Sequence, residues 1–517
     1  MLVINKIRQK KTSYGKNFFL LREFFKTKGG LNMNSILSNI IAEARISFEQ
    51  ILESVTSEQV DKQIHIVEGE LFNQVIQLGK KLLEVFIAKQ GTGNVGQFYK
   101  DANGRERDLH SHRTKQYLSI FGKVTITRTY YWRQKLGGVY PLDAKLNLPK
   151  NSQSYVLEKW VGLLAAHGAY GEARQILKRL IGIEIWNEST ERMMANGSTQ
   201  ADEFYDTYKP SQTEEKELLI ISADGKGIPM KKERSLKKKK RLKKGEKPGK
   251  KKMSTVTTVY TIERHIRTAE KIVESVVQEH KQENNGPNND ERPKPQSKIV
   301  RATLNGKESA FKILAQEVKR RDPDRKKEIV GLVDGEKKLR ELMKTFFGPI
   351  CIILDIFHVL EYLWKAAHLF YSEGSNEAEL WTRGMLYSLL RGKVEDIILY
   401  LKYCLQEKDL LNSQRNTLKK VIGYLNGGKE HMKYDEYIEK GYPIGSGVVE
   451  GACRNLVKDR MERSGMHWTK SGAEAVLGIR SLELNGFLDD YWNFRTKSEQ
   501  QKLYAYYNNE RYEHVAA

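Results

Sequence analysis

Three short apolar runs in this chain each end in an aspartate. "LLIISAD" ends at Asp224, "IVGLVD" at Asp334 and "CIILD" at Asp355. Short apolar runs bounded by turn residues are typical of buried strands, and the last two alternate with helical segments. This alternation predicts an α/β fold with a mixed or parallel sheet covered by helices. Side chains at the carboxyl ends of such strands project into the crevice where α/β proteins bind ligands.

A fourth acid, Glu450, follows the glycine turn "PIGSG" at the start of a predicted helix, where Arg454 and Lys458 continue the same face. Clustered carboxylates raise one another's pKa unless a cation lies among them. Mg²⁺ prefers oxygen ligands, and two such ions about 4 Å apart can promote phosphodiester chemistry. For each acid taken alone, a turn-forming or helix-capping role is the alternative.

The charge of the chain points to a polyanionic partner. Its formal net charge is +23, which favours nucleic acid first and an anionic membrane surface second. Between 231 and 252, 14 of 22 residues are Lys or Arg, so this tract is a solvated loop, either a phosphate-binding arm or a solubilising or localisation tract. The candidate DNA contacts in it are Lys237, Lys238, Lys239, Lys240, Arg241, Lys243 and Lys244.

Three further features argue against a membrane-spanning protein, a disulfide-bonded protein and a P-loop enzyme. No apolar stretch approaches the roughly 20 residues that a membrane span needs. The three cysteines are widely spaced, which fits a reducing cytosol. "GKG" at 225–227 lacks the spacing of a P-loop.

The pattern of residues along the chain predicts a succession of segments. Apolar residues at helical spacing, including Phe72, Val75, Leu82 and Phe86, predict packed helices with a scaffolding or dimerising role. "GKVTITRTYYW" alternates like a strand after a turn at Gly122. The expected segments are a disordered basic arm or leader (1–33), helices (34–95), a small β element (96–150), helices (151–212), the first part of the core (213–358), a helical insertion (359–440), the final core helices (441–495) and a peripheral tail (496–517).

The helices at 151–212 have the size and punctuation of a helix-turn-helix, which places its last helix in a DNA groove. Ser189 or Thr190 is the expected cap of a helix that exposes Arg192. A plain helical bundle explains the same pattern equally well.

Four motifs carry a family resemblance: "SADGKGIPM", "GLVDGEKKLREL", "LDIFHVLEYLW" and "PIGSGVVEGACRNLVKDRMERSGMHW". They resemble the DDE transposases of bacterial insertion sequences, most closely the ISKra-type group related to Mutator-like enzymes, over roughly residues 96–495. The resemblance implies an RNase H-like catalytic core interrupted by a helical insertion. It also implies Mg²⁺-dependent cleavage at transposon ends, with Mn²⁺ tolerated, and strand transfer into double-stranded target DNA. Because two DNA ends must be joined, at least a homodimer is expected.

Carried over onto this sequence, the resemblance makes Asp224 the first catalytic acid and metal ligand, Asp334 the second and Glu450 the last. Asp355 and His358 then match the accessory (C/D)xxH signature, although sequence spacing alone does not separate Asp334 from Asp355.

Three roles stay open for His358: a polar pair with Asp355, a contact with metal or phosphate, or a helix cap. Trp364 is expected in the core. Further candidate DNA contacts are Arg454, Lys458, Arg460 and Trp468; for Trp468, a core position and a base-stacking surface are the two alternatives.

The chain departs from the family at one place. Relatives often carry a CxxC pair near "TYYWRQKLGGVYPLD", where this chain has Trp132 and Lys135. Thiolates close a structural zinc site, so no zinc is expected here.

Two functions remain open. One is an active transposase in the bacterial cytoplasm, associated with the nucleoid; the other is a catalytically silent DNA-binding repressor derived from one. An acid/base hydrolase such as a glycosidase is a third class, but the basic charge argues against it.

Overall fold

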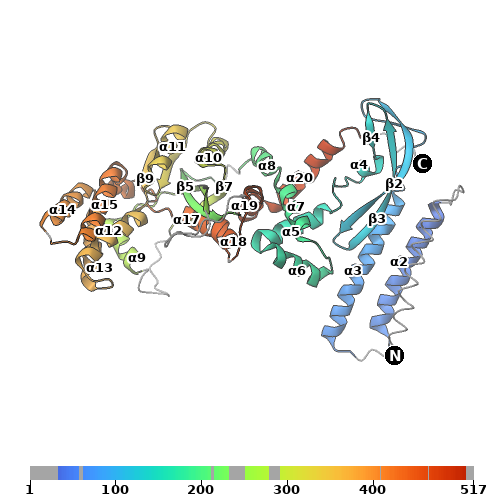
Figure 1. Ribbon diagram of the computed structural model, residues 1–517, viewed down its shortest axis with the longest axis horizontal. Helices are drawn as coiled ribbons and strands as arrows, with labels where there is room; N and C mark the ends of the chain where they lie inside the picture. Colours follow the sequence, from blue (N-terminus) through green and yellow to red (C-terminus); the bar gives the residue numbers. More distant parts are fainter. Residues whose placement is uncertain are drawn as a thin grey trace, which may run out of the picture. The chain divides into compact units, whose positions relative to one another are not determined.

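The computed structural model describes residues 33–57, 62–210, 215–231, 251–278, 292–407, 409–463 and 465–507. The chain divides into two compact units (Figure 1). The first contains the described residues up to Leu157, Leu177–Ile183 and those from Ser498 onward; the second contains Glu158–Ile176 and Glu184–Lys497. The predicted basic arm, apart from Met33, and most of the lysine tract lie outside the described residues. In the described part of the chain, every helix falls short of the length and apolarity that crossing a bilayer requires.

The first unit contains a helical hairpin and a four-stranded antiparallel sheet. The hairpin consists of α2 (Met33–Thr56) and α3 (Ile64–Lys89), followed by β1 (Phe98–Lys100), β2 (Glu106–Ser119), β3 (Gly122–Arg133), β4 (Gly137–Val139) and α4 (Pro141–Lys145). The strands lie in the order β1-β2-β3-β4. Gly122 takes a φ of +109° at the turn from β2 to β3, which favours glycine. All four strands lie within the residues 96–150 for which a small β element was predicted.

Two buried ion pairs and the end of the chain stabilise this sheet. Arg107 Nη1 donates to Asp101 Oδ2 over 2.9 Å, and Arg128 pairs with Asp143. The Tyr506 hydroxyl donates to the carbonyl of Tyr140 over 3.3 Å, and its ring meets Tyr99 edge-on. Residues near the end of the described chain thus pack on this sheet through an aromatic ring.

The second unit is built on a five-stranded mixed sheet in the order β7-β6-β5-β8-β9. Strands β5, β6 and β7 are antiparallel neighbours, whereas β8 pairs parallel with β5 and β9 parallel with β8. The sheet is mixed and covered by helices, as predicted. Its strands are β5 (Leu218–Pro229), β6 (Lys251–Ile262), β7 (Gln296–Thr303), β8 (Glu328–Val333) and β9 (Cys351–Leu354).

Helices cover the sheet and follow it along the chain. Figure 1 shows α10 and α11 on one side of the sheet and α17 to α19 on the other. The described residues between 359 and 440 contain helices and no strand, and the first of these helices begins at Ile356 because Asp355 caps it. The helices are α9 (Ala269–Gln278), α10 (Lys307–Arg321), α11 (Lys337–Phe347), α12 (Ile356–Phe370), α13 (Asn376–Leu390), α14 (Val394–Glu407), α15 (Asn412–Gly428), the 3₁₀ turn η1 (Lys429–His431) and α16 (Tyr434–Glu439).

The segment predicted as a helix-turn-helix is helical: α5 (Tyr155–His167), α6 (Tyr170–Ile181), α7 (Asn187–Ser198) and α8 (Ala201–Thr207). The predicted cap is wrong, since α7 begins at Asn187 and Thr190 is buried within it, donating its hydroxyl to the Trp186 carbonyl over 3.2 Å. The buried face of α7 packs against α19, and Arg192 stays exposed. Groove reading by α7 stays a prediction.

The helix that carries Glu450 differs from the predicted regular α-helix. The segment α17 (Gly447–Ala452) continues as a π-helix, η2 (Cys453–Lys458), before α18 (Asp459–Met461). A π turn uses i→i+5 hydrogen bonds, so the predicted shared face of Glu450, Arg454 and Lys458 does not follow α-helical spacing. Such π segments are frequent at functional sites.

The final helices are α19 (Lys470–Leu484) and α20 (Leu488–Leu503). The predicted boundary between 495 and 496 therefore falls inside α20.

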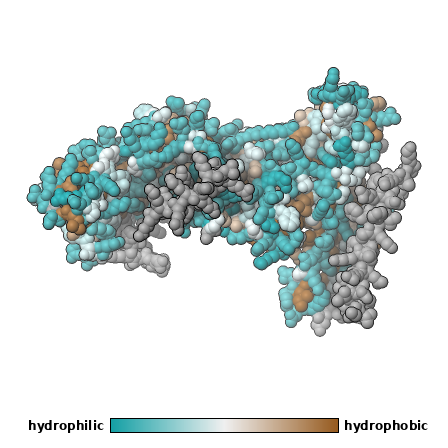
Figure 2. All heavy atoms as spheres, viewed as in Figure 1, coloured by the Kyte–Doolittle hydropathy of each residue, from teal (hydrophilic) through white to brown (hydrophobic). Residues whose placement is uncertain are grey.

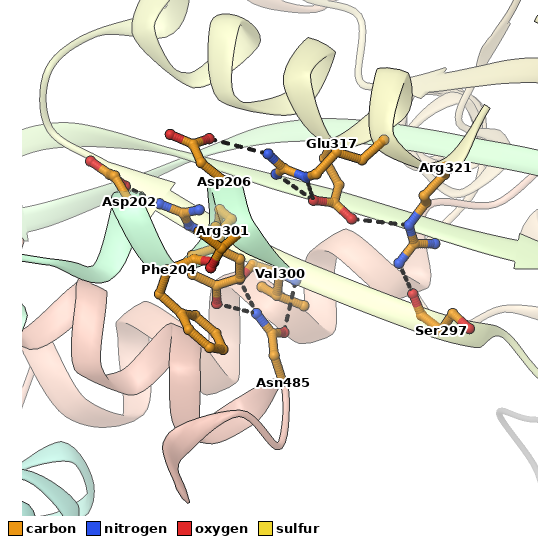
Figure 3. A network of polar contacts seen from close by, with 12 residues as sticks. Asp202, Phe204, Asp206, Ser297, Val300, Arg301, Glu317, Arg321 and Asn485 are labelled. Atoms are coloured by element: carbon orange, nitrogen blue, oxygen red, sulfur yellow. Dashed lines mark hydrogen bonds and ion pairs between the residues drawn. The ribbon is translucent and has the colours of Figure 1, made fainter. Parts of the chain in front are cut away.

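A polar network fastens the edge strand β7 to its neighbours (Figure 3). The Asn485 amide pairs with the Val300 backbone in both directions: it accepts from the Val300 N–H over 2.9 Å and donates to its carbonyl over 3.0 Å. Arg301 pairs with Asp202 of α8, and Arg321 of α10 donates to the carbonyl of Ser297 near the start of β7. Because an edge strand exposes unpaired backbone groups, these contacts protect it while holding α8 and α10 in place.

Candidate active site

The register of the parallel strands brings the three predicted aspartates to one edge of the sheet. Ala223 of β5 pairs with Val333 of β8, and Val333 pairs with Leu354 of β9. Asp224, Asp334 and Asp355 each follow directly after these paired residues. The backbone N–H of Asp355 also donates to the carbonyl of Val333 over 2.9 Å. Three carboxylates on adjacent strands therefore lie at the same level of the sheet.

The sequence predicted that Asp224 ends its strand, but β5 continues beyond it to Pro229. Its parallel pairing with β8 stops at Ala223, but the antiparallel ladder with β6 continues from Asp224 to Pro229. The glycines at 225 and 227 are therefore accommodated inside a hairpin strand. The buried Cys453 thiol donates to Asp224 Oδ2 over 3.3 Å. Burial and the Asp224 carboxylate raise the pKa of this thiol, so it stays protonated and holds the carboxylate as a donor.

Asp334 lies in the turn that leads from β8 into α11. Its Oδ1 accepts a hydrogen bond from the backbone N–H of Glu336 over 2.9 Å. Burial raises the pKa of Asp334, and the charge of Asp224 raises it further, against the opposing effects of this hydrogen bond and of His358. The Asp224 carboxylate is therefore close enough to influence the ionisation of Asp334.

Asp355 is fully buried and caps α12, accepting from the Phe357 N–H over 3.0 Å. Its second oxygen accepts from the Ser446 hydroxyl, which is also within 3.2 Å of Glu450 Oε1. Ser446 comes from the "GSG" turn before α17, so this turn places Glu450 beside Asp355. Burial raises the pKa of Glu450, and the charge and hydrogen bonding of Asp355 add to that rise.

His358 completes this group. Its Nε2 lies 3.9 Å from Asp355 Oδ2, which is too long for a hydrogen bond. Because Asp355 is the residue that caps α12, the capping role for His358 is wrong. One ligand atom from each of Asp355, His358 and Glu450 lies within 4.8 Å of the others.

The acids thus form two adjoining groups, Asp224 with Asp334 and Asp355 with His358 and Glu450. Burial and neighbouring carboxylates raise the pKa values of Asp334 and Glu450, and a cation bound among the acids would favour their ionised forms. Oxygen ligands with one imidazole suit Mg²⁺ or Mn²⁺, so the donor set fits the predicted ions.

Sequence reasoning missed Ser446 and Cys453. Both lie within the motif that contains Glu450, at four residues before it and three after it, which is the signal that helical spacing offered. Their roles depend on contacts with Asp355 and Asp224, more than 90 residues earlier in the chain.

The predicted DNA contacts that the structure describes fall into two groups, exposed side chains and buried ones. Arg192, Arg454 and Lys458 are exposed. Arg460 is only 1% exposed: its guanidinium donates to the Ala165 carbonyl over 2.7 Å and lies over the Trp468 ring. Trp468 is 8% exposed, and its indole N–H donates to the Met461 carbonyl over 3.0 Å. The Arg460 side chain is thus used inside the protein, in contrast to the predicted DNA contact, whereas Trp468 takes the core position that was one of its two alternatives.

The remaining predicted positions are Trp364 and seven basic residues of the lysine tract. Trp364 packs against the core, as expected. The seven basic candidates between Lys237 and Lys244 lie outside the described residues.

Comparison with known proteins gives limited similarity. No protein-family model matches the chain. Over 170 residues it is 27% identical to the "UPF0236 protein in vanSb 3'region" of Streptococcus gallolyticus, a match that covers 32% of this chain and 35% of that protein. The match thus spans about a third of the relative's length. Among solved structures, the Drosophila P element transposase strand transfer complex aligns with 68% of this chain and 82% of its own chain, at 9% identity and a TM-score of 0.24. A TM-score this low supports no conclusion about the fold or the function of this chain.

Proposed function

We propose that this protein is a DDE-type DNA transposase with an RNase H-like core, which cleaves DNA at the ends of its element and joins them to target DNA. The observation that carries the proposal is the strand register, which sets Asp224, Asp334 and Asp355 at one edge of the sheet with Glu450 beside them. The mixed sheet and the helices inserted between β9 and α17 support the core that the resemblance implies.

In this proposal Asp224, Asp334 and Glu450 are the ligands of two Mg²⁺ ions, with Mn²⁺ tolerated, and Asp355 and His358 flank them. When bound, the ions supply activation of the attacking oxygen and stabilisation of the leaving oxygen. The residues of the chain hold the ligands in place: the Cys453 thiol orients Asp224, the Glu336 N–H orients Asp334, and Ser446 spans Asp355 and Glu450.

Basic side chains near the acids supply the contact with DNA. Arg454 and Lys458 are exposed on the π-helical segment that directly follows Glu450. The strands β5 and β6 lead to the lysine tract, since the last pair of their ladder is Pro229 with Lys251. Phosphate contacts of this kind give affinity without sequence preference and position the duplex.

The alternative is a DNA-binding repressor without catalysis. The presence of all four acids favours the enzyme, because a binding protein gains nothing from repelling carboxylates with raised pKa values. The test incubates the purified chain and Mg²⁺ with labelled DNA from the element's own ends. Nicked and joined products support the transposase. Tight binding without any product, in Mg²⁺ and in Mn²⁺, supports the repressor.

A further inference from the structure

Tyr424 connects the helical insertion with the edge of the sheet that carries the acids. It lies in α15, which packs against α12 and α14 within the second unit. Figure 2 shows brown, apolar side chains on the surface near α14, where Leu399 and Tyr403 are exposed. Tyr424 differs from them, because its ring meets the turn that follows Asp334 and its hydroxyl is buried. The insertion therefore brings a polar group to this turn from a segment outside the four motifs.

Two neighbours hold the Tyr424 ring in place. The ring stacks on that of Tyr362 in α12, with centroids 3.7 Å apart and an angle of 7° between the planes. It also lies so close to Gly335 that a Cβ atom at that position would be 2.3 Å from its Cε2. Any other residue at 335 would displace either the ring or the turn. Gly335 and Tyr362 thus fix the direction of the hydroxyl.

The Tyr424 hydroxyl is a buried polar group that has no hydrogen-bond partner among the described residues. Removing a hydroxyl from water without replacing its hydrogen bonds costs free energy. Nearly all buried polar atoms in native proteins therefore have a protein or water partner. An exception beside a group of acids points to a partner that arrives with a ligand.

The hydroxyl lies near two of the acids. Burial raises the pKa of Tyr424, and the neighbouring Tyr362 raises it further. The carboxylates of Asp334 and Asp355 add to that rise, and Arg340 opposes it. Both acids are thus close enough to act on the hydroxyl, although neither forms a hydrogen bond with it.

A second tyrosine of the insertion provides a contrast. Tyr434 of α16 donates its hydroxyl to the carbonyl of Leu354 over 2.7 Å, directly before Asp355. Its hydroxyl is therefore used to fasten the insertion to the end of β9. The Tyr424 hydroxyl has no such role within the described part of the chain, so it stays available to a ligand.

A water bound to a divalent cation fits this position. Mg²⁺ usually keeps several of its waters when carboxylates bind it. The oxygen of such a water is bonded to the ion, so the water acts as a hydrogen-bond donor, and the Tyr424 oxygen has lone pairs that accept. A DNA phosphate fits less well, because its negative charge would lie beside two carboxylates.

We propose that Tyr424 is a positioning residue of the acid site, whose hydroxyl oxygen accepts a hydrogen bond from a water bound to the divalent cation that the acids hold. The inference rests on the proposed function for that cation and adds to it a residue of the helical insertion. Partners of this kind orient the groups bound to a metal, and losing one typically weakens metal binding by about 10- to 100-fold.

The test measures Mg²⁺ binding to the full-length chain without DNA, by isothermal titration calorimetry at pH 8. Tyr424→Phe keeps the stacked ring and removes only the oxygen, and it should raise the Kd for Mg²⁺ at least about 10-fold. The same variant should melt at a higher temperature than the wild type in EDTA, because it no longer buries a hydroxyl without a partner. A purely structural role of the ring predicts no change in the Kd.

Tyr434→Phe is the matched control, because it removes the same atom from a neighbouring tyrosine whose hydroxyl has a partner. It should melt at a lower temperature in EDTA, through loss of the bond to Leu354, and should leave the Kd for Mg²⁺ unchanged. An equal rise in the Kd of both variants would mean that any disturbance of the insertion weakens the site, which overturns the specific role of Tyr424.

The outcomes separate this inference from the proposed function. If Glu450→Gln weakens Mg²⁺ binding and Tyr424→Phe does not, the cation site stands and the role of Tyr424 is overturned. If Tyr424→Phe binds Mg²⁺ as the wild type does but cleaves element-end DNA more slowly, the hydroxyl contacts DNA, which also overturns the inference. A wild type that binds neither Mg²⁺ nor Mn²⁺ contradicts the proposed function, and the inference falls with it. Weaker binding in Tyr424→Phe, with Tyr434→Phe unchanged, supports the inference.

Discussion

Removing the charge of Glu450 should stabilise the cation-free protein while abolishing its response to Mg²⁺. Oxygens of Asp355 and Glu450 lie within 4.8 Å, a distance at which two unit charges repel by about 3–4 kcal/mol at an effective dielectric constant of about 20. Partial burial of the Glu450 carboxyl raises its pKa, but the residue as a whole is exposed, so solvent screening reduces this repulsion to about 1–2 kcal/mol. Glu450→Gln should therefore raise the melting temperature at pH 8 in EDTA by about 1–3 °C.

Adding Mg²⁺ should reverse the order of stability. At 100 times its Kd, an ion that binds only the folded wild type adds about 2.7 kcal/mol, and the Gln variant should gain much less. Differential scanning calorimetry with and without Mg²⁺ measures both effects. Glu361→Gln, an exposed change one turn after His358, is the control and should alter neither value beyond about 0.5 kcal/mol. The reasoning is refuted if Glu450→Gln lowers the melting temperature in EDTA, or if both proteins gain equally from Mg²⁺.

Further predictions concern the same acids and the basic tract. Asp334→Asn should abolish cleavage and leave DNA binding intact, whereas Asp355→Asn should lower stability or slow the reaction in part; the opposite pattern in a cleavage and thermal-melt comparison moves the second catalytic role to Asp355. Burial and neighbouring carboxylates raise the pKa values of Asp334 and Glu450. Their contribution to cation-free stability is therefore complete at low pH and is lost as pH rises through the raised values, whereas cation binding needs the ionised forms. The Mg²⁺-induced rise in melting temperature should accordingly shrink between pH 8 and pH 5, and a constant rise contradicts the assignment. Ser446→Ala removes a hydrogen bond to a buried carboxylate and should cost about 2 kcal/mol in urea unfolding; no loss means that the bond is not formed. Replacing the lysines of 231–252 with Gln should flatten the dependence of log K on log salt by about 0.9 for each lost phosphate contact, and an unchanged slope means that the tract does not touch DNA.

The sheet was predictable because apolar runs that end in aspartate are local features of the sequence. The position of Asp224 within its strand was not, because the continuation of β5 depends on its antiparallel pairing with β6 from Asp224 to Pro229. Apolar content identifies a strand, but its end depends on the partner that continues the ladder. The common level of Asp334 and Asp355 at the edge of the sheet was likewise not predictable, because it follows from the register of the paired strands.

The site was predictable in its acids but not in the groups that orient them. Ser446 and Cys453 act through contacts across more than 90 residues of sequence. The π-helix after Glu450 has no simple signature in composition. Arg460 was predicted at the surface because arginine is usually exposed, but its guanidinium is held inside by the Ala165 carbonyl of α5 and the Trp468 ring. Only tertiary structure supplies such partners.

The most direct test of the central claim is a change of metal preference at Glu450. The Glu450→Cys variant replaces a carboxylate with a thiolate, which binds Mn²⁺ far better than Mg²⁺. Cleavage of labelled element-end DNA is measured for wild type and variant in each cation, with DNA binding measured in parallel. We expect the wild type to cleave in both cations, and the variant to bind DNA equally well, to fail in Mg²⁺ and to recover cleavage in Mn²⁺. A variant that cleaves in Mg²⁺ at the wild-type rate, or that binds DNA but fails in both cations, would contradict the claim that Glu450 holds a catalytic metal.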